Sequence, residues 1–171
     1  MIDKIISRLM RIVLAPLTDP EIIWVSLPLI GSLVLIEIYF GRYKKEELGW
    51  NSAISNSLLL CFVGIDLLRR IFDKNHPYLT FPYARFTIAL VIILSGIFLL
   101  YLNFYHKLPK WLAFTLSSVI PINITAYMAT VVIYTSMTID FITFFSWVLL
   151  ILIVWGIFQI IHSLEPEAWG D

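Results

Sequence analysis

Charged residues are scarce in this sequence. Only 14% of its 171 residues are Asp, Glu, Lys or Arg, whereas about a quarter of the residues in a water-soluble domain are charged. Twelve basic residues balance twelve acidic ones, so the chain has no net charge to attract nucleic acid or an acidic substrate. We therefore exclude nucleic acid as a partner.

Cysteine and known catalytic motifs are also lacking. Cys61 is the single cysteine, which excludes an intramolecular disulfide and a cysteine-based metal site within one chain. No GxSxG, HExxH, P-loop or GxGxxG pattern occurs. His106 and His162 end two apolar segments near Glu165 and Glu167, but without the short spacing of a zinc site. The sequence therefore predicts no metal, no cofactor and no catalytic residue.

What the sequence has in abundance is apolar residues, 60% of the total, gathered in blocks of about 20. A helix of that length crosses the roughly 30 Å of hydrocarbon in a bilayer. We predict an all-α fold, a polytopic membrane helix bundle of about five transmembrane helices in contact with the lipid bilayer. The expected spans are residues 22–40, 51–71, 83–105, 110–135 and 139–162.

The first residues differ from these blocks, because apolar side chains alternate with cations at helical spacing. Residues 2–15 place six aliphatic residues on one side and Lys4, Arg8 and Arg11 on the other. These charges also argue against a cleavable signal peptide. We predict an interfacial amphipathic helix over residues 1–18, with a helix packed against the bundle as the alternative. Residues 19–162 then form the transmembrane domain, and residues 163–171 an exposed acidic tail.

Two proline positions mark expected helix starts. Asp19, Pro20 and Glu21 form a helix start with an N-cap carboxylate, a first-position proline and an acid in the first turn. Pro109 is expected at the first position of the fourth span.

Orientation follows from the positive charges. The N-terminal side carries seven Lys and Arg residues and the opposite side five, which favours a cytoplasmic N-terminus by a narrow margin. The expected location is a cell membrane, taken to be prokaryotic.

No ionisable residue lies near the centre of a predicted span. Proton-coupled transporters usually have a titratable group there, so this absence weakens the hypothesis of such a transporter. Glu37 lies one turn from the far interface. There it is expected to reach water or to pair with Arg42, Lys44 or Lys45, and a functional carboxylate is the alternative.

The second span has a polar face. Ser52, Ser55, Asp66 and Arg70 fall within about 80° of one another at 100° per residue, with Asn56 beside them. We expect this face to turn toward protein or water, because lipid leaves its donors unpaired.

Asp66 has two possible sets of partners. Arg69 and Arg70 follow it by three and four residues, the spacing of a local salt bridge. The alternative is an inter-helix network of Asp66 and Arg70 with Arg85 and Asp140.

The fourth span has a second polar stripe. Asn123, Tyr127, Thr130 and Tyr134 recur at helical spacing after Pro121, which removes a backbone hydrogen bond. Asn123 is expected to satisfy the freed carbonyl or to bond a neighbouring helix, and a substrate pathway is the alternative. Small residues are expected to allow close helix packing at Gly31, Ser32, Gly96, Ala126, Ala129 and Gly156.

These patterns favour a non-enzymatic membrane protein, such as a structural, assembly or complex subunit acting through helix–helix contacts. Its expected partners are other membrane subunits or a second copy of the chain. The alternative is a small channel or transporter with a polar path between the second and fourth spans.

Overall fold

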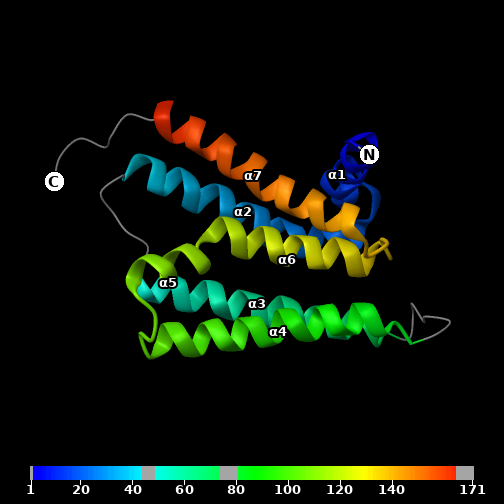
Figure 1. Ribbon diagram of the computed structural model, residues 1–171, viewed down its shortest axis with the longest axis horizontal. Helices are drawn as coiled ribbons and strands as arrows, with labels where there is room; N and C mark the ends of the chain where they lie inside the picture. Colours follow the sequence, from blue (N-terminus) through cyan, green and yellow to red (C-terminus); the bar gives the residue numbers. More distant parts are fainter. Residues whose placement is uncertain (1, 44–48, 74–80, 165–171) are drawn as a thin grey trace.

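The protein is an all-α helix bundle, as the sequence predicts. The computed structural model describes residues 2–43, 49–73 and 81–164, and these contain helices and no strand (Figure 1). The helices are α1 (Ile2–Thr18), α2 (Pro20–Arg42), α3 (Trp50–Ile71), α4 (Tyr83–Phe104), α5 (Lys110–Leu116), α6 (Val119–Tyr134) and α7 (Phe141–Leu164).

Five segments of the described chain are long and apolar enough to cross a membrane. They are α2, α3, α4, the α5–α6 segment Lys110–Tyr134, and α7, with 22 to 25 residues each. At about 1.5 Å per residue they exceed 30 Å. Asp19 caps α2 as expected, since its carboxylate accepts from the backbone N–H of Glu21 at 3.0 Å. Pro109 precedes α5 as its N-cap, so the predicted first helical position is wrong by one residue.

The fourth span is not one continuous helix, contrary to expectation. Ser117 and Ser118 separate α5 from α6, and Ser118 is extended, with φ −69° and ψ 160°. The physical reason is Pro121, which has no backbone N–H and whose ring would clash with the Ser117 carbonyl in a continuous helix. The break places Pro121 in the first turn of α6, where no such hydrogen bond is needed.

Helix α6 is the centre of the bundle. In Figure 1 it lies between α2 and α7 on one side and α3 and α4 on the other. Fourteen of its 16 residues are buried, and it packs against α2, α3 and α7. The other spans leave large apolar side chains uncovered, such as Trp24, Phe98 and Trp155. These side chains suit contact with hydrocarbon rather than water.

Helices α3 and α4 make the closest packing in the bundle. A Cβ atom at Gly96 would lie 2.8 Å from Cys61 Sγ and 2.9 Å from the Cys61 backbone nitrogen, and one at Gly64 would clash with Ile93. The expected packing role is confirmed for Gly96. It is wrong for Gly31 and Gly156 among the described residues, because none of their atoms lies within 4 Å of a Cβ at either position.

Helix α1 does not run along the axis that the long helices share (Figure 1). Its apolar residues divide into two faces: Ile12 and Ala15 are buried against the bundle, whereas Ile2, Ile6 and four others are exposed. The remaining face carries Lys4, Ser7 and Arg11. The helix thus packs against α7 and α2 and also offers an apolar face to its surroundings. Its position at the membrane surface stays a prediction.

Candidate functional site

Charged side chains gather at the end of the bundle where α2 begins and α3 ends. Oδ1 of Asp66 accepts from Nε and Nη2 of Arg69 at 3.0 and 2.8 Å. Its Oδ2 accepts from the Tyr134 hydroxyl of α6 at 2.7 Å. Asp66 thus makes both a local salt bridge and a bond between helices, and the inter-helix partner is a tyrosine.

Arg70 ties a third helix into this group. Its Nη1 lies 3.3 Å from Oε2 of Glu21 on α2, and its guanidinium stacks over the Tyr134 ring at 5.0 Å from the ring centre. We call Glu21, Asp66, Arg69, Arg70 and Tyr134 the end cluster. The end cluster joins three helices, because Arg70 of α3 pairs with Glu21 of α2 and Asp66 of α3 accepts from Tyr134 of α6.

The alternative expectation, a network of Asp66 and Arg70 with Arg85 and Asp140, is wrong. Arg85 donates to the Met137 carbonyl at 3.4 Å. Asp140 pairs with Arg8 of α1 at 3.3 Å. Arg8 also donates to the Thr138 carbonyl at 3.0 Å. The reason is that α1 packs beside α7 and brings Arg8, one of the three cations on the predicted polar side of this helix, to Asp140.

Asp140 also caps the start of α7. Its Oδ1 accepts from the Thr143 backbone N–H at 2.8 Å and from the Thr143 hydroxyl at 2.9 Å. These two hydrogen bonds, together with the Arg8 charge, lower the pKa of the Asp140 carboxyl below its ordinary value.

Two carbonyls freed by prolines are satisfied from other helices. Pro121 frees the Ser117 carbonyl, which accepts from the amide of Asn56 on α3 at 2.7 Å. Pro16 frees the Ile12 carbonyl of α1, which accepts from the Tyr127 hydroxyl at 2.7 Å. The expectation that Asn123 fills the first role is therefore wrong, because Asn56 of α3 reaches that carbonyl instead.

Asn103 is a buried polar residue that the sequence reasoning missed. Its amide nitrogen donates to Ser117 Oγ at 2.8 Å, Ser57 Oγ at 2.9 Å and the Ala53 carbonyl at 3.3 Å. Asn103 and both serines are fully buried. The available signal was an asparagine inside the apolar third span. These bonds join α3 and α4 to the break between α5 and α6.

The polar face of α3 is rotated relative to the prediction. Ser52 and Ser55 are exposed, whereas Asn56 and Ser57 are buried. The rotation follows from packing, because the small residues Ala53, Ser57 and Gly64 must face the neighbouring helices for α3 and α4 to approach closely.

Glu37 lies beside a histidine instead of a lysine or arginine. Its carboxylate is 3.6 Å from Nε2 of His162, and the same nitrogen lies 2.8 Å from the Glu37 carbonyl oxygen. The expected pairing with Arg42 is not seen, and residues 44 and 45 lie outside the described residues. The other histidine named above, His106, stacks its ring on that of Trp50.

Asn123 has a weak hydrogen bond for so buried a residue. Only 2% of its surface is exposed, and its Oδ1 accepts from Ser32 Oγ at 3.4 Å. It therefore contacts a neighbouring helix, as expected, but through one long bond.

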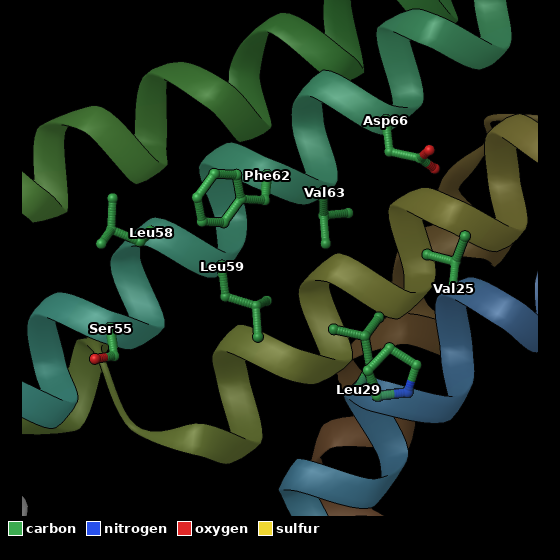
Figure 2. Close-up of a pocket in the computed structure, with 9 residues that line it drawn as sticks. Val25, Leu29, Ser55, Leu58, Leu59, Phe62, Val63 and Asp66 are labelled. Atoms are coloured by element: carbon green, nitrogen blue, oxygen red, sulfur yellow. The ribbon is translucent and has the colours of Figure 1, made fainter.

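A groove of about 500 Å³ separates α2 from α3 (Figure 2). Two polar residues of α3, Ser55 and Asp66, lie toward its two ends, and the side chains between them are apolar. It is lined by Val25, Pro28, Leu29, Ser55, Leu58, Leu59, Phe62, Val63 and Asp66. Figure 2 shows Leu29 and Val25 on α2 facing Leu59 and Val63 on α3. The two helices make few contacts with each other, so this surface is left uncovered by the described chain.

Comparison of the chain with protein-family models, curated proteins and solved structures found no match. Within residues 2–43, 49–73 and 81–164, no three His, Cys, Asp or Glu side chains are grouped to hold a metal ion. The arrangement therefore offers hydrogen-bonded helix contacts, a paired charge cluster and an apolar groove.

Proposed function

We propose that the protein is a non-enzymatic membrane subunit or scaffold, and that the groove between α2 and α3 receives a transmembrane helix of another chain. The observation that carries this proposal is the groove itself. It runs from Ser55 to Asp66, about 16 Å or three helical turns, between two helices that barely touch. A groove of that length can accommodate the side chains along one face of a helix packed against it.

The ends of the groove favour a helix over a lipid tail. The Ser55 hydroxyl is exposed and has no hydrogen-bond partner among the described residues. An acyl chain has no polar atom to offer it, whereas a helix can place a serine, threonine or asparagine there. At the other end, Arg69 is 69% exposed and can contact an acidic residue near the end of such a helix.

The polar residues of this chain support the same function. Asn56, Asn103 and Tyr134 all make hydrogen bonds between helices of the bundle. We further propose that the N-terminus is cytoplasmic, on the count of seven against five positive charges.

Site-specific photocross-linking in native membranes tests the groove. A photoreactive amino acid at Phe62, on the groove, is expected to give a discrete protein adduct, with this chain or another. The matched control is Phe98 on α4, an exposed phenylalanine outside the groove, which is expected to label lipid. Equal adducts at both positions, or lipid adducts alone, would contradict the proposal.

The alternative, a channel or transporter between α3 and the α5–α6 span, has less support. Facing polar groups of these helices are bonded to each other, as Asn56 is to Ser117 and Asp66 to Tyr134. Flux through liposomes separates the two functions. Robust flux that Asn123→Ala and Ser55→Ala abolish would defeat the scaffold.

A further inference from the structure

A second cavity, of about 200 Å³, lies between α1, α2, α6 and α7. Seven of its nine lining side chains are aliphatic, and the other two are Tyr127 and Asn123. Tyr127 already donates its hydroxyl hydrogen to the Ile12 carbonyl. Asn123 is thus the lining residue with a hydrogen-bond donor left.

The amide nitrogen of Asn123 makes no hydrogen bond to another described residue. The residue is 98% buried, and its one hydrogen bond within the described residues runs from Ser32 to its oxygen. A buried amide N–H without a partner is unfavourable, so native proteins generally satisfy it. Because Asn123 lines the cavity, its nitrogen can donate to a molecule bound there.

The surroundings favour an apolar molecule over water. A buried water needs two to four polar partners, whereas this cavity is lined by seven aliphatic side chains, the Asn123 amide and a Tyr127 hydroxyl whose hydrogen is already donated to Ile12. Asn123 also lies about midway along the span Lys110–Tyr134, near the bilayer centre. The ester carbonyls of phospholipids lie outside the hydrocarbon core, about 15 Å from its centre, so they do not reach this depth.

The cavity opens toward the bilayer. Val13 of α1 and Ile30 of α2 line it and are 49% and 47% exposed, whereas Leu29, Leu33 and Leu150 are buried. A ligand dissolved in hydrocarbon can therefore enter sideways between α1 and α2.

We propose that this cavity binds the ring of a lipophilic ketone, the chemistry of a membrane quinone, with Nδ2 of Asn123 donating to a ketone oxygen. The size agrees, because an apolar cavity of about 150 Å³ binds benzene. A cavity of about 200 Å³ accepts such a ring with small substituents. This site is separate from the groove and does not depend on the proposed scaffold function.

Two matched probes test the hydrogen bond. Duroquinone and durene are flat rings with the same four methyl groups, and the quinone alone carries acceptor oxygens. Calorimetric titration of the purified full-length protein in detergent, with protein-free micelles as blank, measures both affinities. Duroquinone is expected to bind about tenfold more tightly than durene, the effect of one buried hydrogen bond. Equal affinities, or no saturable binding of either probe, overturn the proposal.

Two variants locate the site. Asn123→Leu is expected to remove the preference for duroquinone and to keep durene binding, because leucine has the same branched arrangement of heavy atoms while the donor is lost. Val154→Phe fills the cavity without changing the Asn123 amide and is expected to lower the affinity for both probes at least tenfold. Should Asn123→Leu not fold, Val154→Phe still decides where the probes bind. An unchanged preference in the first variant, or unchanged affinities in the second, refutes the site.

Discussion

The two sides of α6 are packed differently. On the side of α3 and α4, glycine brings the backbones into contact and the amide nitrogen of buried Asn103 has three acceptors. On the side of α1, α2 and α7, a cavity lies beside Asn123, which has one long hydrogen bond. The same residue type is thus structural where its amide nitrogen is hydrogen-bonded and available to donate to a ligand where that nitrogen is not.

The largest effect is expected at the tight contact. Gly96→Ala places a Cβ 2.9 Å from the Cys61 backbone nitrogen, which cannot move aside as a side chain can. We expect the free energy of unfolding in mixed micelles to fall by about 2–3 kcal/mol. Gly156→Ala is the control, because no atom of the described chain lies within 4 Å of its added Cβ, and it should change this free energy by less than about 0.5 kcal/mol. Equal losses in the two variants would contradict the close packing.

The two asparagines give the next largest difference. Asn103→Leu leaves the buried hydroxyls of Ser57 and Ser117 without this donor, and we expect a loss of about 1–2 kcal/mol in the same unfolding assay. Asn123→Leu removes one bond of 3.4 Å and should cost less than about 0.5 kcal/mol. A larger loss from Asn123→Leu than from Asn103→Leu would reverse the comparison.

A smaller effect is expected at the end cluster, which connects the two sides. Asp66→Asn weakens the bonds from Tyr134 and Arg69, and we expect a loss of about 1 kcal/mol. Tyr134→Phe removes only the inter-helix bond and should cost about 0.6 kcal/mol. Additive losses in the double variant would show that the two residues do not interact.

The smallest effect is a pH dependence at Asp140, which is exposed. Its pKa is lowered in the folded state, so its contribution to stability is present above the ordinary carboxyl pKa of about 3.9 and is lost as the pH falls through the folded value. The difference in unfolding free energy between the unmodified protein and Asp140→Asn should therefore shrink as the pH falls from 7 to 2. A difference that stays constant over this range would exclude the effect.

The sequence predicts those features that depend on neighbours along the chain. Apolar blocks of about 20 residues locate all five spans, and the Asp19 cap follows from the residue order at 19–21. The local pair of Asp66 with Arg69 also follows from spacing. Each of these rests on one helix, whose geometry is known in advance.

What the sequence does not predict is how helices are rotated and which residues meet. The burial of Asn56 in place of Ser55 depends on α3 turning its small residues toward α4. The pair of Arg8 with Asp140 joins residues 132 positions apart, and only packing of α1 on α7 brings them together. Pro121 does signal a freed carbonyl, but its partner lies on another helix.

The central place of α6 has a consequence for biosynthesis. Spans enter the membrane in chain order, so α2, α3 and α4 are present before the α5–α6 segment emerges. Asn103 can bond Ser57 at once, because both belong to the α3–α4 hairpin. Asn56 and Asp66 lack their partners Ser117 and Tyr134 until the fourth span arrives. In a chain truncated before residue 110, α2 is therefore expected to stay unpacked from the α3–α4 hairpin. We expect membrane quality control to degrade such a chain.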